Sequence, residues 1–183
     1  GSLPPTAILM PVYHESPSRV LGALVAMREE LLREPGTELV EIFVLSDSRD
    51  VARAASEERA VRRVAPPPGA PIPIRYRRRA RNDHKKSGNI PDFLARWGAR
   101  FELAAVLDAD SLVRGRTLVE MAWRMTEQHR LGLLQAPIEP QGGTTLFARW
   151  QQLSAWLVGP LATAGLGVWA GDHGNYFGHN AVL

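Results

Sequence analysis

Short apolar runs alternate along the chain with stretches of helical composition or helical spacing. The runs at 6–12, 40–48, 72–77, 102–110 and 131–137 predict buried strands. Helices are predicted between or after them, over 16–34, 49–65, 87–100 and 115–129. Strands that alternate with helices are typical of an α/β fold with a mostly parallel sheet. Pro73 places the strand at 72–77 at an edge of that sheet, because proline lacks one ladder hydrogen bond.

Length and composition suit one soluble domain with a sizeable core. The chain has 183 residues and no cysteine, so it has no disulfide framework and no thiolate metal site. No stretch approaches about 18 uninterrupted apolar residues, so no membrane span is expected. Gly1 and Ser2 are interpreted as a cloning scar. The last residues, "NYFGHNAVL", stop on an apolar run, from which we expect a piece cut from a longer protein.

Polar clusters follow the predicted strands in "PVYHE" (11–15), "LSDS" (45–48) and "LDADS" (107–111). Ligands of parallel sheets bind at the carboxyl ends of the strands, where all three clusters belong. Tyr13 suits stacking on a base and Glu15 suits accepting from one, but a core tyrosine and a carboxylate at a helix start are the alternatives. Asp47 is either an acceptor for a base or ribose, or a helix N-cap.

Asp108 and Asp110 are two residues apart, so in an extended chain their carboxylates point the same way. At about 5 Å they would repel by about 3 kcal/mol at an effective dielectric of about 20. A bound cation, a basic neighbour, a raised pKa or a turn that separates them would offset this repulsion. Two carboxylates without cysteine suit Mg²⁺, which keeps waters and substrate phosphates as its other ligands. The alternative is a solvated turn in which one aspartate caps a helix.

Basic residues are unevenly distributed, since seven of the 22 Lys and Arg lie between Arg75 and Lys86. Such a run is most often a solvated face, and nucleic-acid binding is a second interpretation. The run leads directly into Ser87-Gly88-Asn89 at a predicted helix start, where a lysine and a glycine-containing turn suit an anion. An acidic cluster for a cation and a basic one for phosphates together fit a sugar nucleotide.

The segment "GDHGNYFGHN" (171–180) holds Asp172, His173, Asn175, His179 and Asn180. A glycine-rich loop with incidental histidines is the alternative to a site, and the histidine spacing is not diagnostic of a metal. The chain contains neither Gly-x-Ser-x-Gly nor Gly-x-Gly-x-x-Gly, so neither a hydrolase elbow nor a dinucleotide-binding fingerprint is indicated.

Five segments, in this order and spacing, resemble the family 2 glycosyltransferases: "TAILMPVYHE", "FVLSDSRD", "RRRARNDHKKSGN", "VLDADSL" and "NYFGHNAV". Within that family they are most similar to the glucosyltransferases of osmoregulated periplasmic glucan synthesis. The resemblance covers nearly the whole chain. "KSGN" and "DAD" are shared with the wider processive group that includes cellulose synthase, whereas the arginine-rich run and "GHN" are more specific.

The resemblance implies a GT-A fold, an α/β, Rossmann-like class with a mostly parallel sheet flanked by helices. Residues 3–137 would be the nucleotide-sugar-binding half, and residues 138–183 the truncated start of the acceptor-side half. It also implies UDP-glucose as donor, Mg²⁺ or Mn²⁺ as cofactor, and a growing glucan as acceptor of an inverting transfer that elongates a β-glucan backbone. No nucleic acid is expected as a partner. The full protein is expected to have transmembrane segments in the bacterial inner membrane with its catalytic domain on the cytoplasmic face, and this fragment to be soluble.

Roles for individual residues follow from the same resemblance. The nucleotide would be bound by Pro11, Tyr13, Glu15, Asp47, Lys86, Asn89 and Asp108. The metal would be held by Asp108 and Asp110, and the acceptor by Tyr176, Gly178, His179 and Asn180. His14 stands where related proteins often have asparagine.

Two family motifs are missing. The Thr-Glu-Asp-type motif with the general base is expected beyond Leu183, so no catalytic residue is identified within the chain. Arg96-Trp97 and Arg149-Trp150 are not the Gln-x-x-Arg-Trp motif, because Phe93 and Leu146 stand where glutamine is required. One alternative is another cellulose-synthase-like family 2 enzyme. The other is a non-catalytic nucleic-acid-binding module that uses residues 75–86 and gives the two aspartates no role.

Overall fold

In the computed structural model, which describes residues 1–13, 15–79, 81–171, 173–174 and 176–183, the chain forms one six-stranded sheet. The strands are β1 (Thr6–Val12), β2 (Val40–Ser46), β3 (Ile74–Arg78), β4 (Leu103–Val106), β5 (Leu134–Gln135) and β6 (Ala181–Val182). Their spatial order is β3-β2-β1-β4-β6-β5. The first four are parallel, and β6 runs antiparallel to both of its neighbours. The expected α/β class with a mostly parallel sheet is therefore confirmed.

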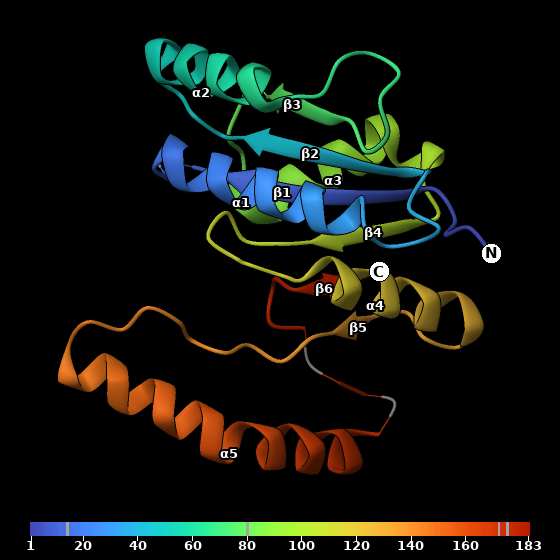
Figure 1. The fold of residues 1–183 in the computed structure, drawn as a ribbon, viewed down its shortest axis with the longest axis vertical. Coiled ribbons are helices and arrows are strands. Elements are labelled where there is room, and N and C mark those ends of the chain that lie inside the picture. The colour runs from blue at the N-terminus through green and yellow to red at the C-terminus, as the bar shows by residue number, and fades with distance from the viewer. Residues whose placement is uncertain (14, 80, 172, 175) are drawn as a thin grey trace.

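Helices cover both faces of the sheet (Figure 1). The covering helices are α1 (Pro17–Leu31), α2 (Val51–Val64), α3 (Lys85–Trp97) and α4 (Gly115–Glu127), with a short 3₁₀ helix at Gly98–Arg100. A fifth helix, α5 (Leu146–Ala170), lies apart from the sheet. Apolar side chains of α1, α2 and α4 pack into one core cluster on one face of the sheet, and α3 packs against the other. The second cluster is built around Phe93, which is fully buried against Phe43 at a centroid distance of 4.7 Å.

The parallel register places the ends of three strands side by side. Val12 of β1 pairs with Ser46 of β2, and Ser46 pairs with Arg78 of β3. On the other side of β1, the backbone N–H of Leu107 donates to the carbonyl of Leu9 at 2.9 Å, so β4 ends at the same edge. This carboxyl edge is where the sequence placed its polar clusters.

Several elements differ from the sequence expectation. The helix expected from Ser87 begins at Lys85, and the strand expected over 102–110 ends at Val106. Asp108–Asp110 form a turn, closed by a hydrogen bond of 3.0 Å from the backbone N–H of Ser111 to the carbonyl of Asp108. The two-residue strand β6 was not predicted, because two residues are too few to show an alternation.

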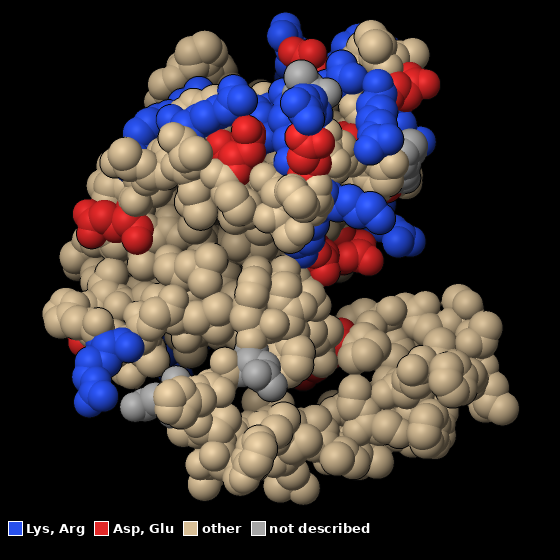
Figure 2. All heavy atoms as spheres, turned by 180° about the vertical axis from the view of Figure 1, so that it is seen from behind, with Lys and Arg blue, Asp and Glu red and all other residues tan. Residues whose placement is uncertain are grey.

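Helix α5 presents an apolar surface, and none of its residues is buried. Figure 2 shows Lys and Arg gathered over the upper part of the molecule, whereas α5, at the bottom, shows none on this face. Among the described residues it is the one helix long and apolar enough, by length and composition alone, to cross a membrane. The count of uninterrupted apolar residues did not single out this helix, because glycine, serine and threonine interrupt its apolar run without adding charge.

Replacing Phe93 by alanine should destabilise the fold by about 3–5 kcal/mol, because it empties the centre of the second core cluster. Its neighbour Leu94 is exposed on the same helix, so Leu94→Ala should cost less than about 1 kcal/mol. Urea unfolding followed by tryptophan fluorescence measures both. Equal losses in the two variants would show that α3 does not pack as described.

Candidate functional site

The turn Ser46–Asp47–Ser48 ends β2 and holds a buried carboxylate. Asp47 and Arg79 form an ion pair whose side chains are only 4% and 7% exposed. The guanidinium uses two groups: Nε donates to Oδ1 of Asp47, and one terminal nitrogen donates to Oδ2 at 3.0 Å. Such paired contacts fix the plane of a carboxylate as well as its charge. Asp47 is therefore not a helix N-cap; Asp50 caps α2 instead, accepting from the N–H of Arg53 at 2.8 Å.

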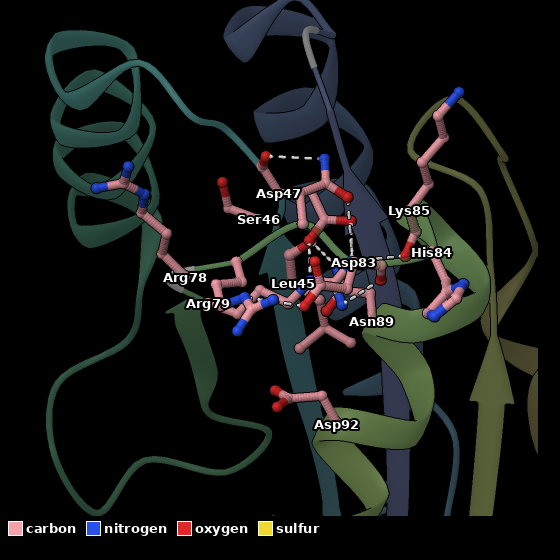
Figure 3. A network of polar contacts seen from close by, with 12 residues as sticks. Leu45, Ser46, Asp47, Arg78, Arg79, Asp83, His84, Lys85, Asn89 and Asp92 are labelled. Carbon is pink, nitrogen blue, oxygen red and sulfur yellow. Dashed lines mark hydrogen bonds and ion pairs between the residues drawn. The ribbon is translucent and has the colours of Figure 1, made fainter.

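Arg79 also fixes the start of α3 (Figure 3). It donates to the carbonyls of Asp83 at 2.9 Å and Lys85 at 2.6 Å. Between these carbonyls the backbone passes through positive φ at both His84 and Lys85. That conformation costs about 1 kcal/mol or more at a residue with a side chain, and it persists only where its surroundings hold it. Arg79 supplies two of those restraints.

The next turn of α3 lies close to the preceding loop. A Cβ on Gly88 would lie 2.1 Å from the carbonyl oxygen of Asp83, so only glycine fits there. One residue on, Asn89 is fully buried and its amide donates to the carbonyl of Leu45 at 2.9 Å, which ties α3 to the end of β2. Its Oδ1 is buried without a hydrogen-bond partner among the described residues. The structure thus places Asn89 behind the edge, and its role toward a nucleotide stays a prediction.

Lys86 and Asp108 meet across the edge, as the ammonium of Lys86 donates to Oδ1 of Asp108. The other oxygen of Asp108 lies 3.6 Å from Nδ1 of His179. Asp110 is exposed and makes no hydrogen bond or ion pair within the described part of the chain. Of the four ways in which the carboxylate repulsion could be offset, the structure shows two, a basic neighbour at Lys86 and a turn at Asp108–Asp110. Neither aspartate caps α4, whose first N–H groups include Gly115, bonded at 2.7 Å to the Glu30 carboxylate.

Strand β6 brings the segment 176–180 to Asp108 from about 70 residues away in the sequence. Gln135 of β5 anchors the segment by donating to the carbonyl of His179 at 2.9 Å and accepting from the N–H of Phe177 at 3.2 Å. Burial raises the pKa of Tyr176, and the negative charge of Asp108 adds to the effect. Gly178 and Asn180 adopt positive φ, which glycine and asparagine tolerate best.

The end of β1 contributes a third part of the edge. Pro11 lies within β1 opposite Leu45, and Tyr13 is exposed just beyond the strand. The carboxylate of Glu15 accepts from the N–H of Tyr13, which closes this turn. The expectations for His14, Asp172 and Asn175 concern positions outside the described residues.

Acidic partners take up most of the arginine-rich run. Five of its seven basic residues have acidic partners within 4.0 Å, in the pairs Arg75–Glu41, Arg77–Asp92, Arg79–Asp47, Arg81–Asp83 and Lys86–Asp108. Arg78 donates to the carbonyl of Ser48 at 2.8 Å. Burial lowers the pKa of the Arg77 guanidinium, although Asp92 opposes this shift. Neighbouring carboxylates therefore offset most of the charge of the run, and only its members Arg77 and Arg79 form largely buried pairs at the edge.

A hard cation would find two carboxylates here, from Asp108 and Asp110. No group of three or more His, Cys, Asp or Glu that could hold a metal exists among the described residues. Mg²⁺ is commonly held by one or two carboxylates together with substrate phosphates, so this donor set fits a metal that arrives with a diphosphate. Lys86 occupies one oxygen of Asp108 in this structure and lies where it would also face that diphosphate.

Comparison with known proteins shows which proteins this chain is similar to. The chain matches no protein-family model. It is 42% identical over 178 residues, or 97% of its length, to the glucans biosynthesis glucosyltransferase H of Xylella fastidiosa (strain 9a5c) and to that of Shewanella oneidensis. The chain matches a segment of the glucosyltransferase H family. The resemblance predicted from the motifs is thus confirmed.

The matched segment is a minor part of these relatives. The chain spans 28% of the Xylella protein and 24% of the Shewanella protein. Among solved structures, it resembles S. aureus TarS 1–349 with a TM-score of 0.47 and 17% identity, covering 77% of this chain and 37% of that one. A likeness at this level supports no inference about function. Within this chain, the charged cluster and the 176–180 loop lie side by side in one fold.

Sequence reasoning found most of this edge but missed Arg79 as its central residue. It treated residues 75–86 as one basic run, because a single sequence does not show which arginines face inward. An alternation was present, since Arg75, Arg77, Arg79 and Arg81 are spaced by two and the first two lie on β3. Read as a strand and its continuation, that spacing would have indicated side chains with different partners.

Gly88→Ala should destabilise the chain by about 2 kcal/mol or more, because the added methyl group meets the carbonyl of Asp83. Gly22, in the exposed middle of α1, has open space around it, so Gly22→Ala should instead stabilise the chain by about 0.5–1 kcal/mol. Thermal unfolding measures both. A neutral Gly88→Ala variant would contradict the close approach of the loop to α3.

Proposed function

We propose that this chain binds the donor of a UDP-glucose-dependent, inverting glucosyltransferase that elongates the β-glucan backbone of osmoregulated periplasmic glucans. The observation that carries the proposal is the convergence of Asp47, Lys86, Asp108 and the loop 176–180 on one edge of the sheet. The 42% identity to glucosyltransferases over nearly the whole chain supports the same assignment.

In this proposal the nucleoside lies over the ends of β1 and β2. Tyr13, exposed beyond β1, stacks on the base, and Glu15 and Asp47 accept from base or ribose donors beside it. Arg79 orients Asp47, because its guanidinium contacts both carboxylate oxygens. Pro11 and Asn89 shape the floor of this half of the site.

The diphosphate half lies between α3 and the turn after β4. Lys86 faces the phosphates, and Asp108 with Asp110 holds Mg²⁺ or Mn²⁺. The metal, when bound, supplies positive charge to the departing diphosphate. Tyr176, Gly178, His179 and Asn180 border Asp108 on the other side, where an acceptor hydroxyl would approach the anomeric carbon in line.

The proposed activity also needs a general base and a Gln-x-x-Arg-Trp motif, which are not found in this chain. The curated relatives are about four times as long as the matched segment. We propose that the general base and the Gln-x-x-Arg-Trp motif lie in that remainder. We also propose a place on the cytoplasmic face of the bacterial inner membrane, which suits the exposed, apolar α5. The internal ion pairs of residues 75–86 disfavour the nucleic-acid-binding alternative.

Isothermal titration calorimetry with UDP-glucose tests the proposal. Binding should require Mg²⁺, disappear with EDTA, and weaken by at least about tenfold in Asp110→Ala, since a charged ligand to the metal is lost. Glu120→Gln, which removes an exposed carboxylate of α4 that pairs with Arg124, should bind as the unsubstituted chain does. Binding that is equal with EDTA, or equal in Asp110→Ala, would contradict the proposed metal-diphosphate site.

A further inference from the structure

A buried carboxylate on α2 contacts the Asp47 turn from behind. Glu57 is 8% exposed and accepts from the hydroxyl of Ser46 at 2.6 Å and from that of Ser48 at 2.5 Å. Tyr76 of β3 donates to the same carboxylate at 3.1 Å. The nearest cationic group is Nε of Arg53, at 3.7 Å. Three hydroxyl groups, together with this arginine, thus surround one carboxylate inside the fold.

Stability alone does not call for a carboxylate at this place. Burying a charge is costly, and well-packed apolar residues often replace such a group without loss of stability. Ser46 is fully buried and Ser48 is 2% exposed, so both hydroxyls need an acceptor inside the fold, which a neutral oxygen could also supply. What the arrangement does fix is the direction of the residue between them, which is Asp47.

Asp47 is held from two opposite sides. On the β3 side, Arg79 binds its carboxylate and Arg78 binds the carbonyl of Ser48. On the α2 side, Glu57 holds both flanking hydroxyls, and the N–H of Ser48 also donates to Oγ of Ser46 at 3.2 Å. Burial raises the pKa of Tyr76 to about 12, with a further contribution from the charge of Glu57. The Tyr76 hydroxyl therefore stays protonated and remains a donor to Glu57 at neutral pH.

We propose that Glu57 is a positioning residue for the nucleoside half of the donor site, acting on the ligand only through Asp47. The inference rests on the proposed function, because it takes Asp47 as the residue that contacts the nucleoside. Losing the acceptor for one serine hydroxyl lets the turn between the two serines rotate. Asp47 then spends less time in the orientation that accepts from the ligand, and affinity falls without any lost ligand contact.

The test is a double-substitution cycle on UDP binding, measured by calorimetry in Mg²⁺. Glu57→Gln keeps the size of the side chain but leaves one oxygen for two serines, so affinity should fall by about threefold to thirtyfold. Asp47→Asn removes the group through which Glu57 acts. Adding Glu57→Gln to Asp47→Asn should then change affinity by less than about twofold. If Glu57→Gln lowers UDP affinity in the Asp47→Asn background by the same factor as in the unsubstituted chain, the inference is overturned.

Two further variants separate positioning from a general loss of folding. Glu58→Gln, at the next position of α2, removes an exposed carboxylate that pairs with Arg62 at 2.6 Å, and should leave UDP affinity unchanged. Ser48→Ala removes one of the two hydroxyls and should reproduce part of the Glu57→Gln loss while the chain remains folded by circular dichroism. If both Ser48→Ala and Glu57→Gln leave UDP affinity unchanged, the inference about Glu57 is overturned but the proposed function is not. Absence of UDP binding by the unsubstituted chain would overturn the proposed function and this inference with it.

Discussion

The buried ion pair between Asp47 and Arg79 is the interaction on which the rest of the edge depends. It joins the end of β2 to the loop before α3, and the same guanidinium holds the two carbonyls that flank His84. Removing one partner of such a pair leaves a buried charge uncompensated, which typically costs about 3–5 kcal/mol. The first turn of α3, and with it Lys86, is therefore placed by a contact made at Asp47.

Most charges at this edge are paired with each other, but one of the pairs, Lys86–Asp108, is accessible to solvent. Most basic residues of the 75–86 run are paired within the fold, so the run does not act as one positive patch. Lys86 and Asp108 differ from the deeper pair, since both side chains are more than one-third exposed. An exposed pair contributes little to stability. In the proposed donor complex, Lys86 and Asp108 separate to contact a phosphate and a cation, at small cost to the fold.

Much of this architecture can be predicted from the sequence. The features that were not predicted share one physical cause, which is their dependence on contacts between distant parts of the chain. Long, strongly apolar strands such as β1 and β2 and the apolar periodicity of helix α1 are local patterns, and these elements appear where expected. Strand β6 depends on a partner, β4, that lies about 75 residues earlier in the chain. The inward orientation of the Arg79 and Glu57 side chains likewise depends on tertiary contacts. From the sequence alone, both residues therefore look like ordinary surface charges. The turn at Asp108–Asp110 was missed for the same reason, because the sequence pattern predicted that the strand continues through these residues.

Hydrogen exchange followed by mass spectrometry, with and without UDP and Mg²⁺, tests the central claim most directly. If the carboxyl edge is the donor site, the ligand should slow exchange in the turn 46–48 and in the start of α3 at 84–89. Helix α4 packs on the same face of the sheet as α1 and contains neither edge segment. It serves as the internal reference, and its exchange rate should not change. Slower exchange confined to other parts of the chain, with both edge segments unchanged, would contradict the account.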